Sequence, residues 1–539
     1  MSFMEMFSRN EFTSRRSDVL GLNGIVATSN PIAANAGLDI LKKGGNCVDA
    51  AVCAASVLNV VEPMSTGIGG DVFALIYDKD SSSVKALNGS GRSGKNSKIE
   101  DFTEFGFKEI PTEGKFSGMS VSVPGAVDAW QELLDKFGNF SLDSVLLPAI
   151  DIANKGFGVS EITANLWNSS QSKLSINDNC DFLINNKSPK FGDFFANPNL
   201  ANVLKGISEN GKSYFYQGDI SNRISDYVKR FHGWLSEEDF AGHESEWIEP
   251  ITSNYRGYDI WECPPNGQGI AALIALNIFE NFDQFDSESD KLHYQIESMK
   301  IAFEDALWYV ADPAKVKVPV EQLLSKEYAK ERFKEIDDSR SNYHYKKGNF
   351  KHQGDTVYIS VIDGDGNACS LINSLYQGFG TGLVVPETGI ALQNRGALFS
   401  LNIDHPNIFE PLKRPFNTII PAMITKHDQL VSSMGVMGGF QQAQGHLQVI
   451  SNMIDYRMSP QSALDSHRFS VSIEEDLVYL ENSFPEQVIL ELKNKVHNID
   501  LKDGYERGLF GGGQIINRNE NGILIGGSDP RKDGQAVSY

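Results

Sequence analysis

The sequence has few cysteines, and none of them has the spacing that a cysteine-based site needs. Cys47, Cys53, Cys180, Cys263 and Cys369 are odd in number, scattered, and never form a CxxC pair. A disulfide framework or a zinc knuckle requires paired or clustered cysteines. The ten histidines do not cluster at metal-ligand spacing either. We therefore expect five buried thiols and no metal site.

Long apolar runs and excess basic charge are also missing. The opening stretch MSFMEMFSRNEFTSRRSDVLG has no run long enough for a signal-peptide core, and no later segment approaches the roughly 20 apolar residues of a spanning helix. The 48 basic and 70 acidic side chains give a formal net charge of −22. Such a surface repels nucleic-acid phosphates and anionic lipids. These features predict a cytoplasmic protein without nucleic-acid or membrane partners.

Three common catalytic signatures, GxxxxGK[ST], HExxH and GxSxG, do not occur. The glycine-rich run GFGTGL at residues 378–383 lacks the strand-to-helix setting and the acidic partner of a dinucleotide-binding loop. We therefore expect chemistry that uses no cofactor.

Local patterns predict a mixture of helices and strands. Asn30 and Pro31 begin a helix that Gly44 and Gly45 end, and the Ala-rich run DAAVCAASVLNVV follows as a buried helix. The runs DVFALIYD and SVKALNG read as a hairpin, and residues 125–137 and 292–310 read as helices. Helical and β-rich segments therefore alternate.

Residues 342–355, NYHYKKGNFKHQGD, are polar and basic, and we expect an exposed connector there. Two β-rich runs follow around Asp-Gly-Asp-Gly-Asn, which predicts a hairpin with Thr356 at its first strand position. The spacing from Asp363 also resembles a calcium loop. Position twelve of that loop holds Ser374 instead of glutamate, however, so the turn is favoured.

Several longer motifs carry a family resemblance over nearly the full length. They are KKGGNCVDAAV, VVEPMSTGIGG, NGSGR, SVPGAVDAW, GDTVYISVIDGDGNA, FGTGLVVPETGIALQN, KRPFNTIIPAM, GVMGG and GGSDPRKDGQAVSY. Together they resemble the gamma-glutamyltransferases, an N-terminal-nucleophile hydrolase family. The resemblance implies an α+β fold, a four-layer αββα sandwich. A large segment (1–355) and a small segment (356–539) would build this one unit jointly.

The resemblance also implies that Thr356 is the catalytic nucleophile of a self-cleaving zymogen. A threonine hydroxyl reacts poorly until a base takes its proton, and an N-terminal amine with a pKa of about 8 can do so at neutral pH. That amine exists only after the Asp355–Thr356 bond breaks. The same hydroxyl is expected to attack the preceding carbonyl in the precursor.

By resemblance, Gly438 and Gly439 present backbone N–H groups to the oxyanion, and Arg92 binds the substrate α-carboxylate. The plainer interpretation of the glycine pair is a tight turn, and that of Arg92 is a surface arginine. Ser374 takes the place of a hydroxyl residue that hydrogen-bonds the nucleophile. Asn417 and Thr418 take that of a carboxylate-binding serine pair.

Three positions depart from the family pattern. Leu398 stands where the transferases carry the acidic ligand of the substrate α-amino group, with Arg395 at a nearby polar position. Tyr376 replaces an asparagine-type ligand, and the segment LNIDHPNIFEPL is shorter than lid-bearing forms require. We therefore expect a more open pocket, less selective for a zwitterionic γ-glutamyl group.

Three functions remain open. The first is cleavage of glutathione-like γ-glutamyl amides through a threonyl acyl-enzyme that water or an amine resolves. The second is a glutaryl- or cephalosporin-type acylase on dicarboxylic acyl amides that lack the α-amino group. The third is an unprocessed, non-catalytic binder of small carboxylates. In the first two functions, the large and small segments stay associated after cleavage. Assembly of two such pairs into a heterotetramer is left open.

Overall fold

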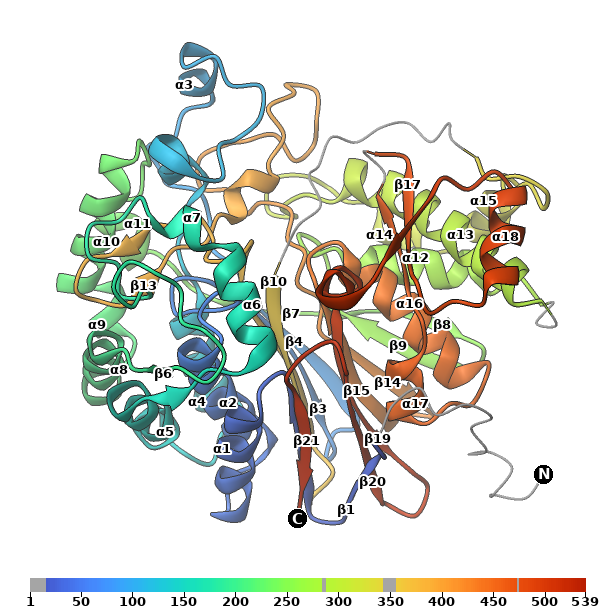
Figure 1. Ribbon diagram of the computed structural model, residues 1–539, viewed down its shortest axis with the longest axis horizontal. Coiled ribbons are helices and arrows are strands. Elements are labelled where there is room, and N and C mark those ends of the chain that lie inside the picture. Colours follow the sequence, from blue (N-terminus) through green and yellow to red (C-terminus); the bar gives the residue numbers. More distant parts are fainter. Residues whose placement is uncertain (1–15, 284–286, 343–354, 473–474) are drawn as a thin grey trace.

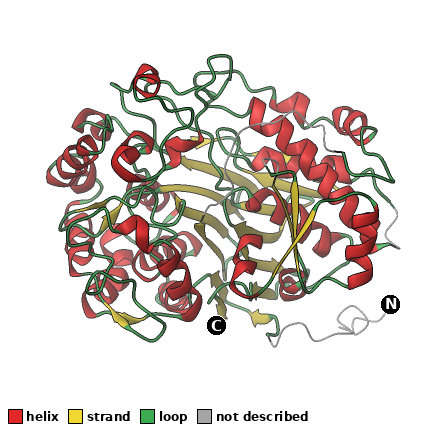
Figure 2. Ribbon diagram, turned by 45° about the horizontal axis from the view of Figure 1, so that its top comes forward, coloured by secondary structure: helices red, strands yellow, loops and turns green. Residues whose placement is uncertain are grey.

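The computed structural model describes residues 16–283, 287–342, 355–472 and 475–539. Two seven-stranded antiparallel sheets face each other, and helices cover the outer face of each sheet (Figures 1 and 2). This arrangement confirms the four-layer αββα sandwich expected from the sequence.

The first sheet has the order β21-β2-β10-β11-β3-β4-β7. Its strands are β2 (Gly24–Thr28), β3 (Asp71–Asp78), β4 (Ser83–Gly89), β7 (Glu246–Ile248), β10 (Asp355–Asp363), β11 (Ala368–Tyr376) and β21 (Gln535–Ser538). β10 is central, because it pairs with β2 on one side and β11 on the other. β10 is therefore paired along both edges from Ile359 to Ile362, and its first residues pair with β11.

The second sheet has the order β1-β20-β19-β15-β14-β9-β8. Its strands are β1 (Val19–Gly21), β8 (Ile251–Tyr255), β9 (Tyr258–Glu262), β14 (Ala422–Lys426), β15 (Gln429–Met437), β19 (Gly512–Arg518) and β20 (Leu524–Ser528). Both sheets thus combine strands that precede Thr356 with strands that follow it.

Side chains alternate between the two faces of β10. Val357, Ile359 and Val361 pack under the helices, whereas Tyr358 and Ile362 lie in the apolar layer between the sheets. Ile372 on the neighbouring strand β11 belongs to the same inner layer. Positions 356 and 374 share this parity, so their side chains lie on the inner side at one end of the sheets.

Two helical layers complete the sandwich. The helices on the first sheet are α1 (Pro31–Lys42), α2 (Cys47–Val61) and α4 (Ala126–Phe137); α5 (Leu142–Lys155) packs on α2, and α8 (Pro198–Asn210) packs on α5. The helices on the second sheet are α12 (Gly269–Phe279), α16 (Gln441–Ile454) and α17 (Pro460–Asp465), and α13 (Glu288–Tyr309) packs on α12.

The remaining elements are short or peripheral. The helices are α3 (Ile99–Glu104), α6 (Glu161–Ser169), α7 (Gln171–Leu174), α9 (Ser213–Tyr216), α10 (Asp219–Arg230), α11 (Glu237–Ala241), α14 (Val320–Leu323), α15 (Lys326–Phe333) and α18 (Glu486–Asn494). The strands are β5 (Phe157–Gly158), β6 (Phe194–Phe195), β12 (Val384–Val385), β13 (Ile390–Ala391), β16 (Phe469–Ser472), β17 (Leu477–Glu481) and β18 (Ile499–Lys502). The 3₁₀ helices include η2 (Gly114–Ser120) and η3 (Arg395–Leu398).

The local predictions are confirmed, with shifts at several helix boundaries. Asn30 caps α1 by accepting from the Ile32 N–H at 2.9 Å, and every residue of α2 is buried. The helix expected from residue 292 begins at Glu288, because the Ser287 hydroxyl caps it by accepting from the Asp290 N–H. All five cysteines are buried thiols, as expected.

The hairpin between β10 and β11 is also confirmed. A carboxylate oxygen of Asp363 accepts from the N–H groups of Asp365 and Asn367, at 3.1 and 3.0 Å. Most of the expected connector, residues 343–354, lies outside the described residues. Among the helices that the structure does describe, none combines the length and the apolar character needed to cross a bilayer.

Candidate active site

Thr356 is the second residue of β10, where the pairing with β11 has a β-bulge. Asp355 pairs with Tyr376 of β11, but Val357 pairs with Asn373, so Thr356 lies opposite two residues of β11, Ser374 and Leu375. A bulge bends the strand that carries the extra residue and redirects its side chains. The Thr356 side chain is fully buried at this irregular point. The bond before Thr356 therefore lies at a local distortion in an otherwise regular sheet.

The polar side chains of Ser374 and Gln442 contact the Thr356 hydroxyl. Its Oγ1 lies 3.1 Å from Ser374 Oγ, and Gln442 Nε2 donates to it over 3.5 Å. Ser374 Oγ accepts from the Tyr376 N–H at 2.9 Å and from Arg395 Nη2 at 3.1 Å. Either hydroxyl can donate across the contact between Thr356 and Ser374. The contacts with Ser374 and Gln442 restrict the position of the threonine hydroxyl.

Arg395 opens η3 and is completely buried. Besides Ser374, its guanidinium donates to Thr418 Oγ1 at 2.7 Å. Its Nε lies 4.0 Å from a carboxylate oxygen of Asp71, and its central carbon lies 4.8 Å from the centroid of the Tyr376 ring. Arg395 thus joins β11, η3 and the start of β3 beneath the threonine.

Asp71 supplies the negative charge beneath Arg395. Its carboxylate accepts from Gln393 Nε2 at 2.9 Å, the Gly91 N–H at 3.2 Å and Asn417 Nδ2 at 3.3 Å. Burial raises the pKa of Asp71 to about 6, although the Arg395 charge acts in the opposite direction. Burial likewise lowers the pKa of Arg395 to about 10. At neutral pH both groups are charged and form a buried ion pair.

Gly438 and Gly439 connect β15 to the helix α16. Their φ angles are +125° and +60°, a region that side chains disfavour. The Gly439 carbonyl accepts from Gln268 Nε2 at 2.9 Å and from the Gln442 N–H at 3.2 Å. Since Gln442 also donates to Thr356, the glycine pair and the threonine share this neighbour. The positive end of the α16 dipole lies at the same place.

Arg92 has a different partner in this structure. Its Nη2 lies 2.6 Å from a carboxylate oxygen of Glu246, and the other oxygen of Glu246 lies 2.8 Å from Arg414. Glu246 and Arg414 line a cavity of about 560 Å³. The backbone beside Arg92 does reach the site, because the Gly91 N–H bonds Asp71. The structure therefore brings Ser374, Arg395 and Thr418 to the threonine, and places the Arg92 guanidinium at an ion pair with Glu246.

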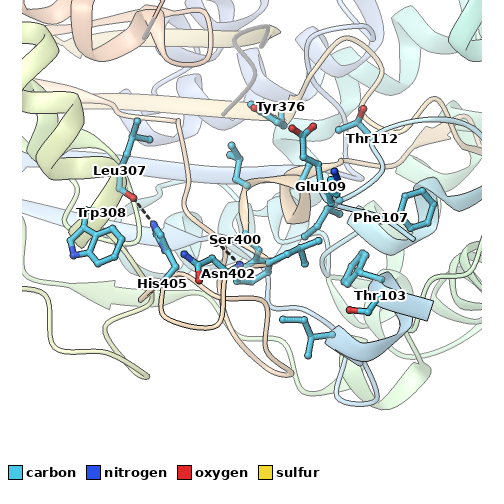
Figure 3. A pocket seen from close by; sticks show the side chains of 18 of the residues that line it. Thr103, Phe107, Glu109, Thr112, Leu307, Trp308, Tyr376, Ser400, Asn402 and His405 are labelled. Atoms are coloured by element: carbon cyan, nitrogen blue, oxygen red, sulfur yellow. Dashed lines mark hydrogen bonds between the residues drawn. The ribbon is translucent and has the colours of Figure 1, made fainter. Parts of the chain in front are cut away.

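A larger cavity, of about 1090 Å³, adjoins the site on the side of Tyr376 and Leu398 (Figure 3). Tyr376 has a φ of +79°, which is strained for a bulky residue. Its ring lies against the Arg395 guanidinium, so Tyr376 belongs both to the cavity wall and to the polar network. Leu398 contributes an apolar, uncharged surface to this cavity.

One group of described residues has the geometry of a metal site. His293, Glu297 and His497 place ligand atoms within 4.8 Å of one another. Glu297 also accepts from Lys300 Nζ at 2.8 Å, so a metal ion would meet a fixed positive charge there. The two imidazoles bond each other at 2.8 Å instead. This cluster shares no residue with the network around Thr356.

The sequence interpretation did not single out Asp71, Gln442 or Gln268. Asp71 directly follows Gly69-Gly70 in a motif that carried the resemblance, and Gln442 follows Gly439 by three residues. Both positions had a signal, namely a polar side chain just after a glycine pair. Gln268 had none, because its link to Gly439 is long-range.

Comparisons with known proteins agree with this arrangement. The family model described as "Gamma-glutamyltranspeptidase" matches residues 33–539. The chain is 39% identical to the "Glutathione hydrolase-like YwrD proenzyme" of Bacillus subtilis (strain 168), over 96% of this chain and 99% of that protein. It is 33% identical to the "Glutathione hydrolase proenzyme" of the same organism, over 96% and 92% of the two chains.

A solved structure extends the similarity to three dimensions. The cephalosporin acylase from Bacillus halodurans superposes with a TM-score of 0.91 at 42% identity, over 99% of each chain. The sequence and structural matches both span the Thr356 network and the two interleaved sheets. The chain therefore belongs to the gamma-glutamyltranspeptidase family and is an enzyme of the N-terminal-nucleophile hydrolase class.

Proposed function

We propose that this protein cleaves itself between Asp355 and Thr356 and then hydrolyses amides through a threonyl acyl-enzyme. One observation carries the proposal: the Thr356 hydroxyl is buried at a β-bulge, 3.1 Å from Ser374 Oγ and within reach of Gln442 beside Gly439. This geometry supports Thr356 as the nucleophile and the backbone at Gly438 and Gly439 as the oxyanion-binding group.

In maturation, Thr356 Oγ1 attacks the Asp355 carbonyl carbon and loses its proton. The tetrahedral intermediate collapses as the C–N bond breaks, the amide nitrogen takes up a proton, and an ester links the two segments. Water hydrolyses the ester, which releases the main-chain carboxylate of Asp355 and restores the threonine hydroxyl. The products are segments 1–355 and 356–539, the second with a new N-terminal amine.

In turnover, that amine takes the proton from Thr356 Oγ1 as the oxygen attacks the substrate amide carbon. The N–H groups of Gly438 and Gly439 stabilise the oxyanion, aided by the N-terminal end of α16. The proton passes to the leaving amine, and the acyl group remains on the threonine. Water then resolves the acyl-enzyme, or a second amine does so in a transfer reaction.

For the substrate we propose a γ-glutamyl amide such as a glutathione-like compound, in line with the names of two relatives. A carboxylate of this donor would bind at Arg395, Asn417 and Thr418, or at Arg92 once that residue separates from the half-exposed Glu246. The acylase alternative rests on Leu398, which cannot pair with an ammonium group, and on the similarity to a cephalosporin acylase.

Intact mass and a chromogenic assay together test the proposal. The purified protein should give two chains that match 1–355 and 356–539, and Thr356→Ala should give one inactive full-length chain. Release of nitroaniline from γ-glutamyl-p-nitroanilide and glutaryl-p-nitroanilide then reports the donor. Normal cleavage in Thr356→Ala would refute the nucleophile, and a single uncut chain in the parent would favour the non-catalytic binder.

A further inference from the structure

The turn between the strand β15 and the helix α16 carries Gly438 and Gly439, and α16 packs back against β15. At Gly445 the two elements come so close that an added Cβ would lie 2.6 Å from the Val436 side chain. Only glycine fits at this contact without a shift of its neighbours. The next residue of the helix, His446, is thereby brought onto the end of the strand.

His446 accepts a hydrogen bond from the end of this strand. The neighbouring strand β14 pairs with β15 only as far as Met434. Two residues further on, the Val436 N–H donates to His446 Nε2 at 3.2 Å. This bond joins the helix to the strand two residues before Gly438. The segment that it closes, residues 436–446, contains both glycines of the turn and Gln442.

The bond from Val436 also fixes the proton on the imidazole. A ring nitrogen that accepts a hydrogen bond carries a lone pair, so the proton of neutral His446 lies on Nδ1. Nδ1 lies 2.6 Å from Glu262 Oε1 and donates to it. Both side chains are fully buried, and burial lowers the pKa of His446 to about 3. The imidazole is therefore neutral at pH 7, and one tautomer satisfies both contacts.

Glu262 comes from the other segment of the chain. It is the last residue of β9, and its Oε2 has no hydrogen-bond partner among the described residues. A Cβ added to Gly269 would lie 3.0 Å from this oxygen, so the carboxyl group lies against the start of α12. The same β9–α12 connection carries Gln268, whose Nε2 donates to the Gly439 carbonyl at 2.9 Å. Segment 1–355 therefore supports the glycine turn at two points.

We propose that His446 is a positioning residue for the oxyanion-binding turn, and that Glu262 holds it in the tautomer that accepts from Val436. This inference rests on the proposed function, in which the N–H groups of the two glycines bind the oxyanion. Such donors stabilise an oxyanion only when they are held at hydrogen-bond distance from it. His446 acts through the backbone of residues 436–439 and not by contact with the substrate.

Two amide substitutions separate the two contacts of the imidazole. Asparagine places its amide group near the position of Nδ1, and glutamine reaches the position of Nε2. His446→Asn should therefore lose the bond from Val436 and lower kcat by about 10- to 100-fold, less than the loss of about 100- to 1000-fold for a donor removed outright. KM should change little, because the ground-state contacts of the substrate are unaltered. His446→Gln keeps an acceptor for Val436 and should retain most of kcat.

Glu262 has a matched pair of variants of its own. Glu262→Gln keeps an oxygen that accepts from Nδ1 and should retain most of kcat. Glu262→Leu removes it and should lower kcat in the same way as His446→Asn. Gln444→Asn is the control: it removes equally buried bonds between α16 and the backbone of Val471, away from the glycine turn, and should leave kcat close to that of the parent. Full activity in Glu262→Leu would overturn the role of the carboxyl group.

Hydrogen exchange followed by mass spectrometry adds a readout that needs no turnover. The peptide that covers residues 434–440 should exchange faster in His446→Asn than in the parent or in Gln444→Asn. Such a difference supports the inference even in a protein that cleaves neither anilide, in which case the proposed function fails alone. Unchanged exchange in His446→Asn, faster exchange with an unchanged kcat, or an equal loss of kcat in both His446 variants would overturn the inference.

Discussion

Replacement of Arg395 by methionine should strongly destabilise the fold, because it leaves Asp71 as an unpaired buried charge. Methionine keeps most of the side-chain volume but removes the donors to Thr418 and Ser374 and the positive charge 4.0 Å from Asp71. Removing one partner of a buried ion pair costs about 3–5 kcal/mol. The experiment uses the Thr356→Ala background, which we expect to remain one uncut chain.

The expected shift in melting temperature follows from the chain length. An unfolding entropy of about 2.1 cal/mol/K per residue over 539 residues gives roughly 1.1 kcal/mol/K, so Tm should fall by about 3–4 °C. The double variant with Asp71→Asn removes the orphaned charge and should recover at least half of that loss. Arg223→Met is the control: it breaks an exposed ion pair with Asp219 and should shift Tm by less than about 1 °C.

Scanning calorimetry or fluorescence melting at pH 7.5 measures these differences. Coupling between the sites requires that the double variant be more stable than the sum of the two single changes predicts. Additive losses would refute the idea that Arg395 and Asp71 act as one buried pair. A loss in Arg395→Met no larger than that in Arg223→Met would refute the assigned burial cost.

Ser374→Ala should slow self-cleavage by at least about tenfold, because Thr356 loses the hydroxyl that contacts it. Ser374→Thr keeps a hydroxyl and should retain most of the rate. A time course of intact mass measures the cleavage rate of each variant. Gly438→Ala should lower the rates of self-cleavage and of substrate turnover by about 100-fold or more. Alanine disfavours a φ of +125°, so the backbone N–H at position 438 must shift. Unchanged rates would exclude an oxyanion-binding role for this N–H. Burial raises the folded pKa of Asp71 to about 6, above about 3.9 in the unfolded chain, so the folded form binds more protons between these values. The stability due to this group therefore falls as pH rises from 4 to 6, and melting curves of Asp71→Asn should lack that component.

Sequence patterns predicted the elements better than their arrangement. The cap at Asn30, the small-residue helix α2 and the hairpin at Asp363 are set by local hydrogen bonds and side-chain size, which neighbouring residues reveal. The pairing of β10 with β2 joins residues more than three hundred positions apart, and no local pattern encodes it. The layer order came from the family resemblance alone.

The site divides in the same way. Thr356 and Gly438 stand in motifs whose spacing marks them, so the sequence sufficed to nominate them. The ion pair of Asp71 with Arg395 depends on two strands and a 3₁₀ turn that meet only in the folded chain. The contact of Arg92 with Glu246 selects one of several acidic side chains, and it depends on where β7 begins relative to β4. Such choices are decided by tertiary distances.

The interleaving of the two sheets has a consequence for when the enzyme becomes active. Ser374 and Gln442, which contact Thr356, follow it in the chain, but Arg395, which donates to Ser374, lies against Asp71 of β3, a strand that precedes Thr356. These residues converge only when the strands from both segments have paired. Self-cleavage through this site would then act as a checkpoint: a chain with either sheet incomplete has no working nucleophile and stays inert. The cut would mark a finished molecule, and two peptides whose strands pair with each other within both sheets cannot part without unfolding.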